Sequence, residues 1–161
     1  MNPKPKWGQR GEWYVVIQIV LFGLIFFAPL IVPAIIPWPT PLDTIGLVVG
    51  SGLALFGGGV AVVGVLNLGR NLTAVPHPKE DAVFVEHGVY RFVRHPIYCG
   101  IIFGAVGWAC LQNSLLALLL ALVLFIFFDI KSRREEKWLV EKYPAYPDYQ
   151  RRVRKLIPLV Y

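Results

Sequence analysis

Three long stretches without Asp, Glu, Lys or Arg constrain the fold of this chain more than any other feature. They cover residues 13–42, 44–69 and 95–128. About 20 apolar residues in a helix cross the hydrocarbon core of a bilayer, and each stretch is longer than that. Of the 161 residues, 56% are hydrophobic and only 16% are charged, which excludes an ordinary soluble domain. Since lipid admits only helices or closed barrels, and these stretches are too long for barrel strands, the sequence predicts an all-α integral membrane bundle.

The uncharged stretches predict about four transmembrane helices in one membrane domain covering residues 1–161. The third stretch would be about 50 Å long as a single helix, too long for one crossing. We expect it to turn at Gln112-Asn113-Ser114 and to form a short helical hairpin. The four predicted spans are residues 13–36, 44–68, 97–111 and 115–130. The first two spans make up the N-terminal part, 1–68, and residues 69–161 are expected to form the functional core.

The distribution of positive charge predicts the orientation of these spans. Lys and Arg residues precede the first span, lie between the second and third, and number nine after the fourth, whereas the turns at 37–43 and 112–114 contain none. The positive-inside rule therefore places both termini, the 70–96 loop and a helical C-terminal tail in the cytoplasm. The tail combines three tyrosines with four basic residues and is expected to lie on an anionic membrane surface. These residues are Tyr143, Tyr146, Tyr149, Arg151, Arg152, Arg154 and Lys155.

Small residues in the spans are interpreted as packing features. The second span carries six glycines, which allow helix backbones to approach closely. They are Gly50, Gly52, Gly57, Gly58, Gly59 and Gly64. Cys99 and Cys110 match no metal or disulfide spacing and are expected to be small core residues.

The segment Arg94-His95-Pro96-Ile97-Tyr98 places titratable side chains where the third uncharged stretch begins. Pro96 suits the first position of a helix, and His95 before it is biased toward an extended conformation. The free N–H groups and positive dipole of that helix start favour an anion such as a carboxylate or phosphate. Polar residues at the edge of a membrane span indicate a binding site.

A second charged cluster, residues 131–137, follows the fourth predicted span. Lys131 and Glu135 are four residues apart and share one face of a helix. That spacing is compatible with a surface ion pair, with an interfacial anchor, or with two residues of a site.

The ordered motifs of the C-terminal half resemble the isoprenylcysteine carboxyl methyltransferase family. They are Gly88-Val89-Tyr90, Arg94-His95-Pro96-Ile97-Tyr98-Cys99-Gly100, an apolar hairpin, Glu135-Glu136, Tyr146-x-x-Tyr149-x-x-x-Val153 and Ile157-Pro158. The match covers roughly residues 69–158. The wider superfamily also contains phospholipid N-methyltransferases and methyltransferases of small thiols.

The resemblance implies S-adenosylmethionine as cofactor and a lipophilic or prenylated acceptor that arrives from the bilayer. Its cofactor positions carry over to Val83, Phe84, Val85, Tyr90, His95, Pro96, Ile97, Tyr98 and Glu135. Tyrosine rings suit a sulfonium cation, and Glu135 suits the cofactor's ammonium or ribose hydroxyls. Acceptor positioning is assigned to Lys131, Arg134 and Glu136. At the position of Lys131, some family members have an arginine. An ionised carboxylate acceptor needs no general base, whereas an amine or thiol would need one, such as His87, His95 or Glu136.

Four other functions remain open at this point. The acceptor can be a phospholipid amine or a thiol. Membrane sterol reductases, which use NADPH, have a similar C-terminal region, but Ile97 and Ile101 stand where they carry Asn and Glu. A lipid-binding scaffold explains the basic tail but not the motif residues. A zinc site of His77, His87 and His95 fits no metal template, so no metal is expected. No nucleic acid partner is expected either, and the oligomeric state is left open.

Overall fold

The computed structural model describes residues 8, 10–32 and 39–161, and the regular secondary structure of this part of the chain is helical. Its five α-helices are α1 (Glu12–Ile31), α2 (Leu42–Leu68), α3 (Pro96–Leu111), α4 (Leu115–Lys142) and α5 (Tyr146–Arg152). Two short 3₁₀ helices, η1 (Gly69–Asn71) and η2 (Gly88–Arg91), interrupt the loop between α2 and α3. Among the described residues, β-type pairing is limited to an isolated parallel bridge between Val93 and Arg154.

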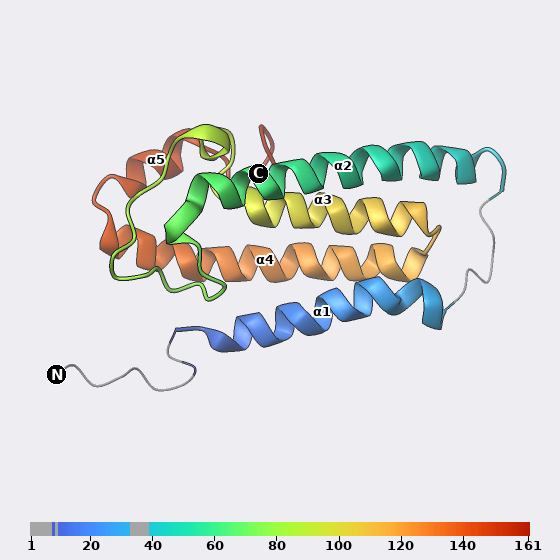
Figure 1. Ribbon diagram of the computed structural model, residues 1–161, viewed down its shortest axis with the longest axis horizontal. Coiled ribbons are helices and arrows are strands. Elements are labelled where there is room, and N and C mark those ends of the chain that lie inside the picture. Colours follow the sequence, from blue (N-terminus) through green and yellow to red (C-terminus); the bar gives the residue numbers. More distant parts are fainter. Residues whose placement is uncertain (1–7, 9, 33–38) are drawn as a thin grey trace.

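Helices α1 to α4 run side by side along the long axis of the molecule (Figure 1). Helix α3 packs against both α2 and α4, and α4 also packs against α1. At one end of the bundle lie the start of α1, the end of α2, the start of α3 and the charged end of α4, covered by the 69–95 loop and by α5 (Figure 1). The turn between α3 and α4 lies at the opposite end. The charged segments are therefore gathered at one end, as the charge distribution predicted.

Within the described part of the chain, three helices, α1, α2 and α4, are long and apolar enough to cross a membrane. Helix α3 has 16 residues, about 24 Å at 1.5 Å per residue, which is short for a crossing. The predicted second and third spans agree with α2 and α3 within two residues. The first predicted span extended to Ile36, and its last part lies outside the described residues.

The predicted turn at residues 112–114 is confirmed. Asn113 has a positive φ of 48°, and the Ser114 hydroxyl caps α4 by accepting a hydrogen bond of 3.2 Å from the N–H of Ala117. The predicted end of the fourth span at Ile130 was too early for the helix, since α4 continues to Lys142. Residues 131–142 contain neither glycine nor proline, and Pro144 is the first residue that cannot continue the helix.

The glycines of α2 form a seam against α3, which confirms the packing interpretation for three of the six. Gly50, Gly57 and Gly64 recur every seven residues and face the backbone of α3. A Cβ atom on Gly57 would lie 2.5 Å from the carbonyl oxygen of Gly100. The other three glycines, Gly52, Gly58 and Gly59, have no such neighbour within 4 Å in the described structure. The seam brings the start of α3 against Gly64, so Pro96 lies beside the end of α2.

Candidate functional site

A cavity of about 440 Å³ lies at the end of the bundle under the 69–95 loop and α5. Its walls come from α1, the end of α2, the loop, the start of α3, α4 and α5. All nine residues to which the family resemblance assigns cofactor contact line this cavity. They are Val83, Phe84, Val85, Tyr90, His95, Pro96, Ile97, Tyr98 and Glu135. Of the three residues assigned to the acceptor, Lys131 lines it, whereas Arg134 and Glu136 are not among its described lining residues.

The residues at the start of α3 line the cavity, and their first backbone N–H groups have no partner within the helix. Pro96 occupies the first helical position, and His95 forms the N-cap without a hydrogen bond from its side chain to the first turn. The first N–H engaged in the helix is that of Cys99, which donates to the carbonyl of His95 over 3.0 Å. The N–H groups of Ile97 and Tyr98 therefore remain for a ligand, at the positive end of the helix dipole.

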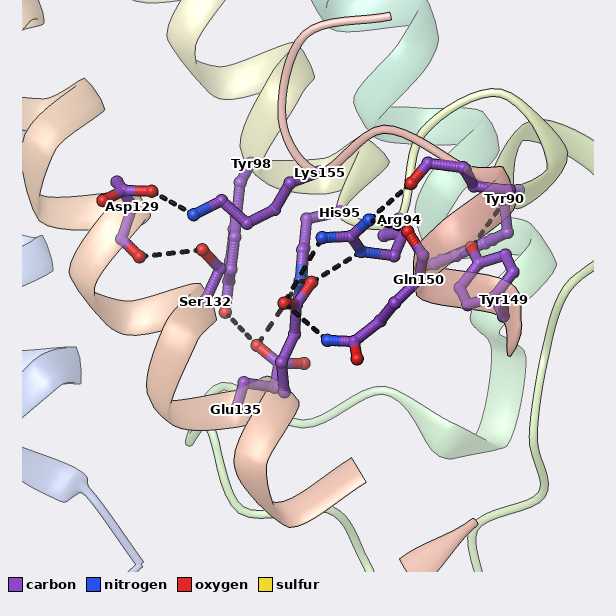
Figure 2. A network of polar contacts seen from close by, with 12 residues as sticks. Tyr90, Arg94, His95, Tyr98, Asp129, Ser132, Glu135, Tyr149, Gln150 and Lys155 are labelled. Carbon is purple, nitrogen blue, oxygen red and sulfur yellow. Dashed lines mark hydrogen bonds and ion pairs between the residues drawn. The ribbon is translucent and has the colours of Figure 1, made fainter. Parts of the chain in front are cut away.

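Glu135 is the one carboxylate among the described lining residues. It accepts a hydrogen bond of 2.8 Å from the Tyr98 hydroxyl (Figure 2) and lies 3.8 Å from His95 Nδ1. The Tyr98 ring is stacked between His95 and Phe128, with ring centroids 5.4 Å and 4.4 Å away. These contacts hold the Glu135 carboxylate at the cavity wall.

Glu136 lies on the other side of His95 and belongs to a buried polar network. Its Oε1 accepts hydrogen bonds from Arg94 Nε over 2.7 Å and from His95 Nε2 over 3.1 Å. Its Oε2 accepts one from Gln150 Nε2 over 3.0 Å. The structure therefore places Glu136 behind His95, where it orients the ring and ties α4 to α5, outside the described lining of the cavity.

The same network fastens the C-terminal segment to the start of α3 (Figure 2). The Arg94 guanidinium also donates to the carbonyls of Gln150 and Val153. The backbone N–H groups of Arg94 and His95 donate to the carbonyls of Arg154 and Lys155 over 2.8 Å and 3.1 Å. These bonds join residues about 60 positions apart in the chain. Through them, the Arg94–Tyr98 segment and the C-terminal tail form one wall of the site.

The tail tyrosines point into the protein and not toward a membrane surface. Tyr146 and Tyr149 are only 3% and 2% exposed and pack around Phe84. The expectation that the aromatic part of the tail lies on a membrane was therefore wrong, because these rings complete the core under the loop. The Tyr149 hydroxyl donates to the carbonyl of Tyr90 over 2.6 Å. Burial raises the pKa of the Tyr149 hydroxyl, so it remains a donor in mildly alkaline solution.

Lys131 and Arg134 have different environments. Lys131 is 1% exposed, and its Nζ donates to Gln18 Oε1 over 2.6 Å and to the carbonyl of Ala74 over 3.1 Å. The same nitrogen lies 5.1 Å from the centre of the Tyr98 ring. Arg134 is exposed and its guanidinium lies 4.7 Å from the Trp138 ring, away from the cavity.

Two contributors to the site were missed from the sequence. Gln18 is the single side-chain amide in the stretch 13–42. A polar residue in an apolar helix indicates a functional position, so the sequence could have identified it. Gln150 carried no such signal, because it lies in a polar tail where an amide is ordinary. Among the described residues, no group of three His, Cys, Asp or Glu side chains is placed to hold a metal ion.

Comparisons with known proteins agree with the resemblance seen in the sequence. The protein-S-isoprenylcysteine O-methyltransferase of Saccharomyces cerevisiae is 32% identical over 117 residues, which cover 70% of this chain and 49% of that protein. A probable protein-S-isoprenylcysteine O-methyltransferase of Oryza sativa subsp. indica is 32% identical over 116 residues, covering 70% of this chain and 61% of that one. The chain thus spans about half the length of the curated relatives it matches.

A solved structure has the same fold. It is that of the eukaryotic intramembrane Ras methyltransferase, isoprenylcysteine carboxyl methyltransferase, with a TM-score of 0.63 and 28% identity, covering 93% of this chain and 53% of that one. The family model described as phospholipid methyltransferase matches residues 45–146, which include most of α2, the loop, α3, α4 and most of the cavity wall. Because this match covers more than half of the chain, the protein belongs to the phospholipid methyltransferase family.

Proposed function

We propose that this protein is an S-adenosylmethionine-dependent membrane methyltransferase that methylates the carboxylate of an isoprenylcysteine-type acceptor. One observation carries the proposal: a single cavity joins the uncapped start of α3, the Glu135 carboxylate, a set of tyrosines and the buried Lys131 ammonium. The proposal includes a four-span arrangement of one membrane domain, with the cavity and both termini on the cytoplasmic side and residues 69–161 as the core.

The cavity fits the proposed cofactor in size and chemistry. Its volume of about 440 Å³ lies in the range of small-molecule sites. The N–H groups of Ile97 and Tyr98 would hold the cofactor's carboxylate. Glu135 would hold its ammonium or its ribose hydroxyls, and the aromatic rings suit its positive sulfonium. When bound, S-adenosylmethionine supplies an electrophilic methyl group.

The acceptor side of the cavity is marked by Lys131. Its ammonium would attract and orient an ionised carboxylate, which is a nucleophile without help from a general base. Positioning two reactants in this way can supply roughly 7 to 11 kcal/mol of a barrier in favourable cases. The loop and α5 cover the cavity and would exclude water.

A phospholipid amine is the second candidate acceptor, because the matching family model is described as phospholipid methyltransferase. Its ammonium must first lose a proton. His95 lines the cavity and could take this proton at Nδ1, because its Nε2 is held by Glu136 over 3.1 Å. The buried Lys131 ammonium in the same cavity would attract a carboxylate and repel a cationic amine, so the carboxylate acceptor suits the observed contacts better.

The acceptor is tested with purified protein in detergent, labelled S-adenosylmethionine and a panel of S-prenylcysteines, aminophospholipids and thiols. We expect methyl esters of the prenylcysteines to form. Transfer only to an amine or a thiol would show that the protein is an amine or thiol methyltransferase instead. The absence of transfer to every acceptor would contradict the proposed function.

Glu135→Gln tests the cofactor site separately. Glutamine can still accept the hydrogen bond from Tyr98 but lacks the charge that would pair with a cationic ligand. Hydrogen bonds to charged groups contribute roughly 1.5 to 3 kcal/mol, so S-adenosylmethionine affinity should fall by about tenfold or more in calorimetry. Glu141→Gln, an exposed position on the same helix, is the matched control and should bind as the wild type does. Equal affinities of all three proteins would remove Glu135 from the site.

A further inference from the structure

Helix α1 contributes a polar side chain to the cavity although it lies outside the family match at residues 45–146. This residue is Gln18, on an otherwise apolar helix. Placing an amide within a membrane helix is unfavourable unless it has a partner. Gln18 reaches across the bundle to Lys131, 113 positions later in the chain.

The contact determines how the Gln18 amide is oriented. An ammonium group has three N–H donors and no acceptor, so the amide must turn its oxygen toward Lys131 Nζ, at 2.6 Å. The amide nitrogen then faces away from the lysine, and in the described structure it donates to no protein group. Lys131 uses two of its three donors, for Gln18 and for the carbonyl of Ala74.

Lys131 has no carboxylate in direct contact, although Glu135, one helical turn away, acts on its charge at longer range. Among the described residues, no Asp or Glu oxygen lies within 4.0 Å of its nitrogen, and the side chain is 1% exposed. A buried ammonium whose direct contacts are neutral oxygens and an aromatic ring is incompletely compensated. Such a group favours an anionic ligand at its remaining donor.

We propose that Gln18 and Lys131 together bind the acceptor carboxylate, with the Gln18 amide N–H on one oxygen and the Lys131 ammonium on the other. A carboxylate is recognised best by two parallel donors, which one arginine provides and one lysine does not. The amide of Gln18 supplies the missing second donor. This inference rests on the proposed function, since it specifies how that site selects a carboxylate.

The test measures the effect of Gln18→Met in two backgrounds, the wild-type protein and the Lys131→Arg variant. Methionine keeps the length of the side chain and removes both polar groups. In the natural protein, Gln18→Met should raise the KM for an S-prenylcysteine by about tenfold, the usual effect of losing a hydrogen bond to a charged group. In Lys131→Arg the guanidinium provides both donors, so the same change should raise KM by less than about twofold.

Two controls separate binding from folding. Ile19→Ala changes the neighbouring residue, which is 64% exposed on the same helix, and should leave KM unchanged. The affinity for S-adenosylmethionine should be unchanged in every variant. If Gln18→Met does not retain that affinity, Gln18→Glu serves as the test variant instead. Glutamate keeps the bond to Lys131, but it lacks the N–H donors and repels a carboxylate, so the KM for the S-prenylcysteine should rise.

The outcomes distinguish this inference from the proposed function. An unchanged KM in Gln18→Met, or an equal rise in both backgrounds, would show that Gln18 does not touch the acceptor while leaving the methyltransferase proposal intact. If the natural protein transfers no methyl group to any carboxylate, the proposed function fails, and the carboxylate site fails with it.

Discussion

The glycine seam between α2 and α3 allows a prediction with a built-in control. A Cβ atom on Gly57 would lie 2.5 Å from the Gly100 carbonyl oxygen and 2.6 Å from the Gly104 nitrogen, whereas one on Gly58 would meet nothing within 4 Å. Both neighbours of Gly57 are backbone atoms, which cannot rotate away. To restore ordinary contact at 3.4 Å, the two helices must separate locally by about 1 Å.

Such a separation should cost about 2 to 3 kcal/mol, at the upper end of typical overpacking penalties. At roughly 2 to 4 °C per kcal/mol for a chain of this size, Gly57→Ala should lower the melting temperature by about 5 to 10 °C. Gly58→Ala should be neutral or slightly stabilising, because alanine favours the helix by up to about 1 kcal/mol.

The assay is thermal unfolding of the two variants in the same detergent, followed by circular dichroism. Two results would contradict this prediction: a melting temperature of Gly57→Ala equal to that of the wild type, or a loss of stability in Gly58→Ala as large as that in Gly57→Ala. Either result would mean that close backbone contact does not hold α2 against α3.

Two further predictions concern the network around the cavity. Glu136→Gln removes the buried carboxylate that pairs with Arg94, so the protein should lose roughly 3 kcal/mol of stability, measured by thermal melting. The affinity for S-adenosylmethionine, measured by calorimetry, should also fall because His95 is no longer oriented. If the stability and the affinity of Glu136→Gln both equal those of Glu141→Gln, the network has no such role. Burial raises the pKa of Tyr149, so its contribution to stability is complete below about pH 10 and declines as the pH rises further. Tyr149→Phe should therefore be less stable at pH 7 and lose less on going to high pH; a melting-temperature slope identical to that of the wild type would exclude this tyrosine as a cause.

Local patterns in the sequence predicted much of the fold correctly. The turn at Gln112-Asn113-Ser114 was evident because a polar, turn-forming break interrupts a stretch too long for one crossing. The extent of α4 was less evident, since a change from apolar to charged residues marks where a membrane ends and not where a helix ends. Helix formers continue as far as Lys142, and the helix follows them.

Which residues gather around the cavity follows from the sequence only in part, for a physical reason. The positions near Pro96 that the resemblance assigns to the cofactor are contiguous in the chain, so a motif identifies them together. Glu135 and Glu136 are also adjacent, but side chains one position apart on a helix point about 100° away from each other. Only the packing of α4 against α3 decides that Glu135 faces the cavity while Glu136 pairs with Arg94. The same holds for Arg134, which the helix turns toward Trp138.

The sequence by itself determined that this chain is a helical membrane protein with a polar site at the start of its short third helix. Those properties depend on uncharged stretches, on proline placement and on contiguous motifs, all of which act over a few residues. Tertiary structure alone decided which distant groups share the cavity: Gln18 from α1, Lys131 from α4 and the tyrosines of the tail. These contacts join residues up to 113 positions apart, and they form because packing the apolar faces of the helices brings polar side chains from different helices together at one end of the bundle, where they can hydrogen-bond to one another.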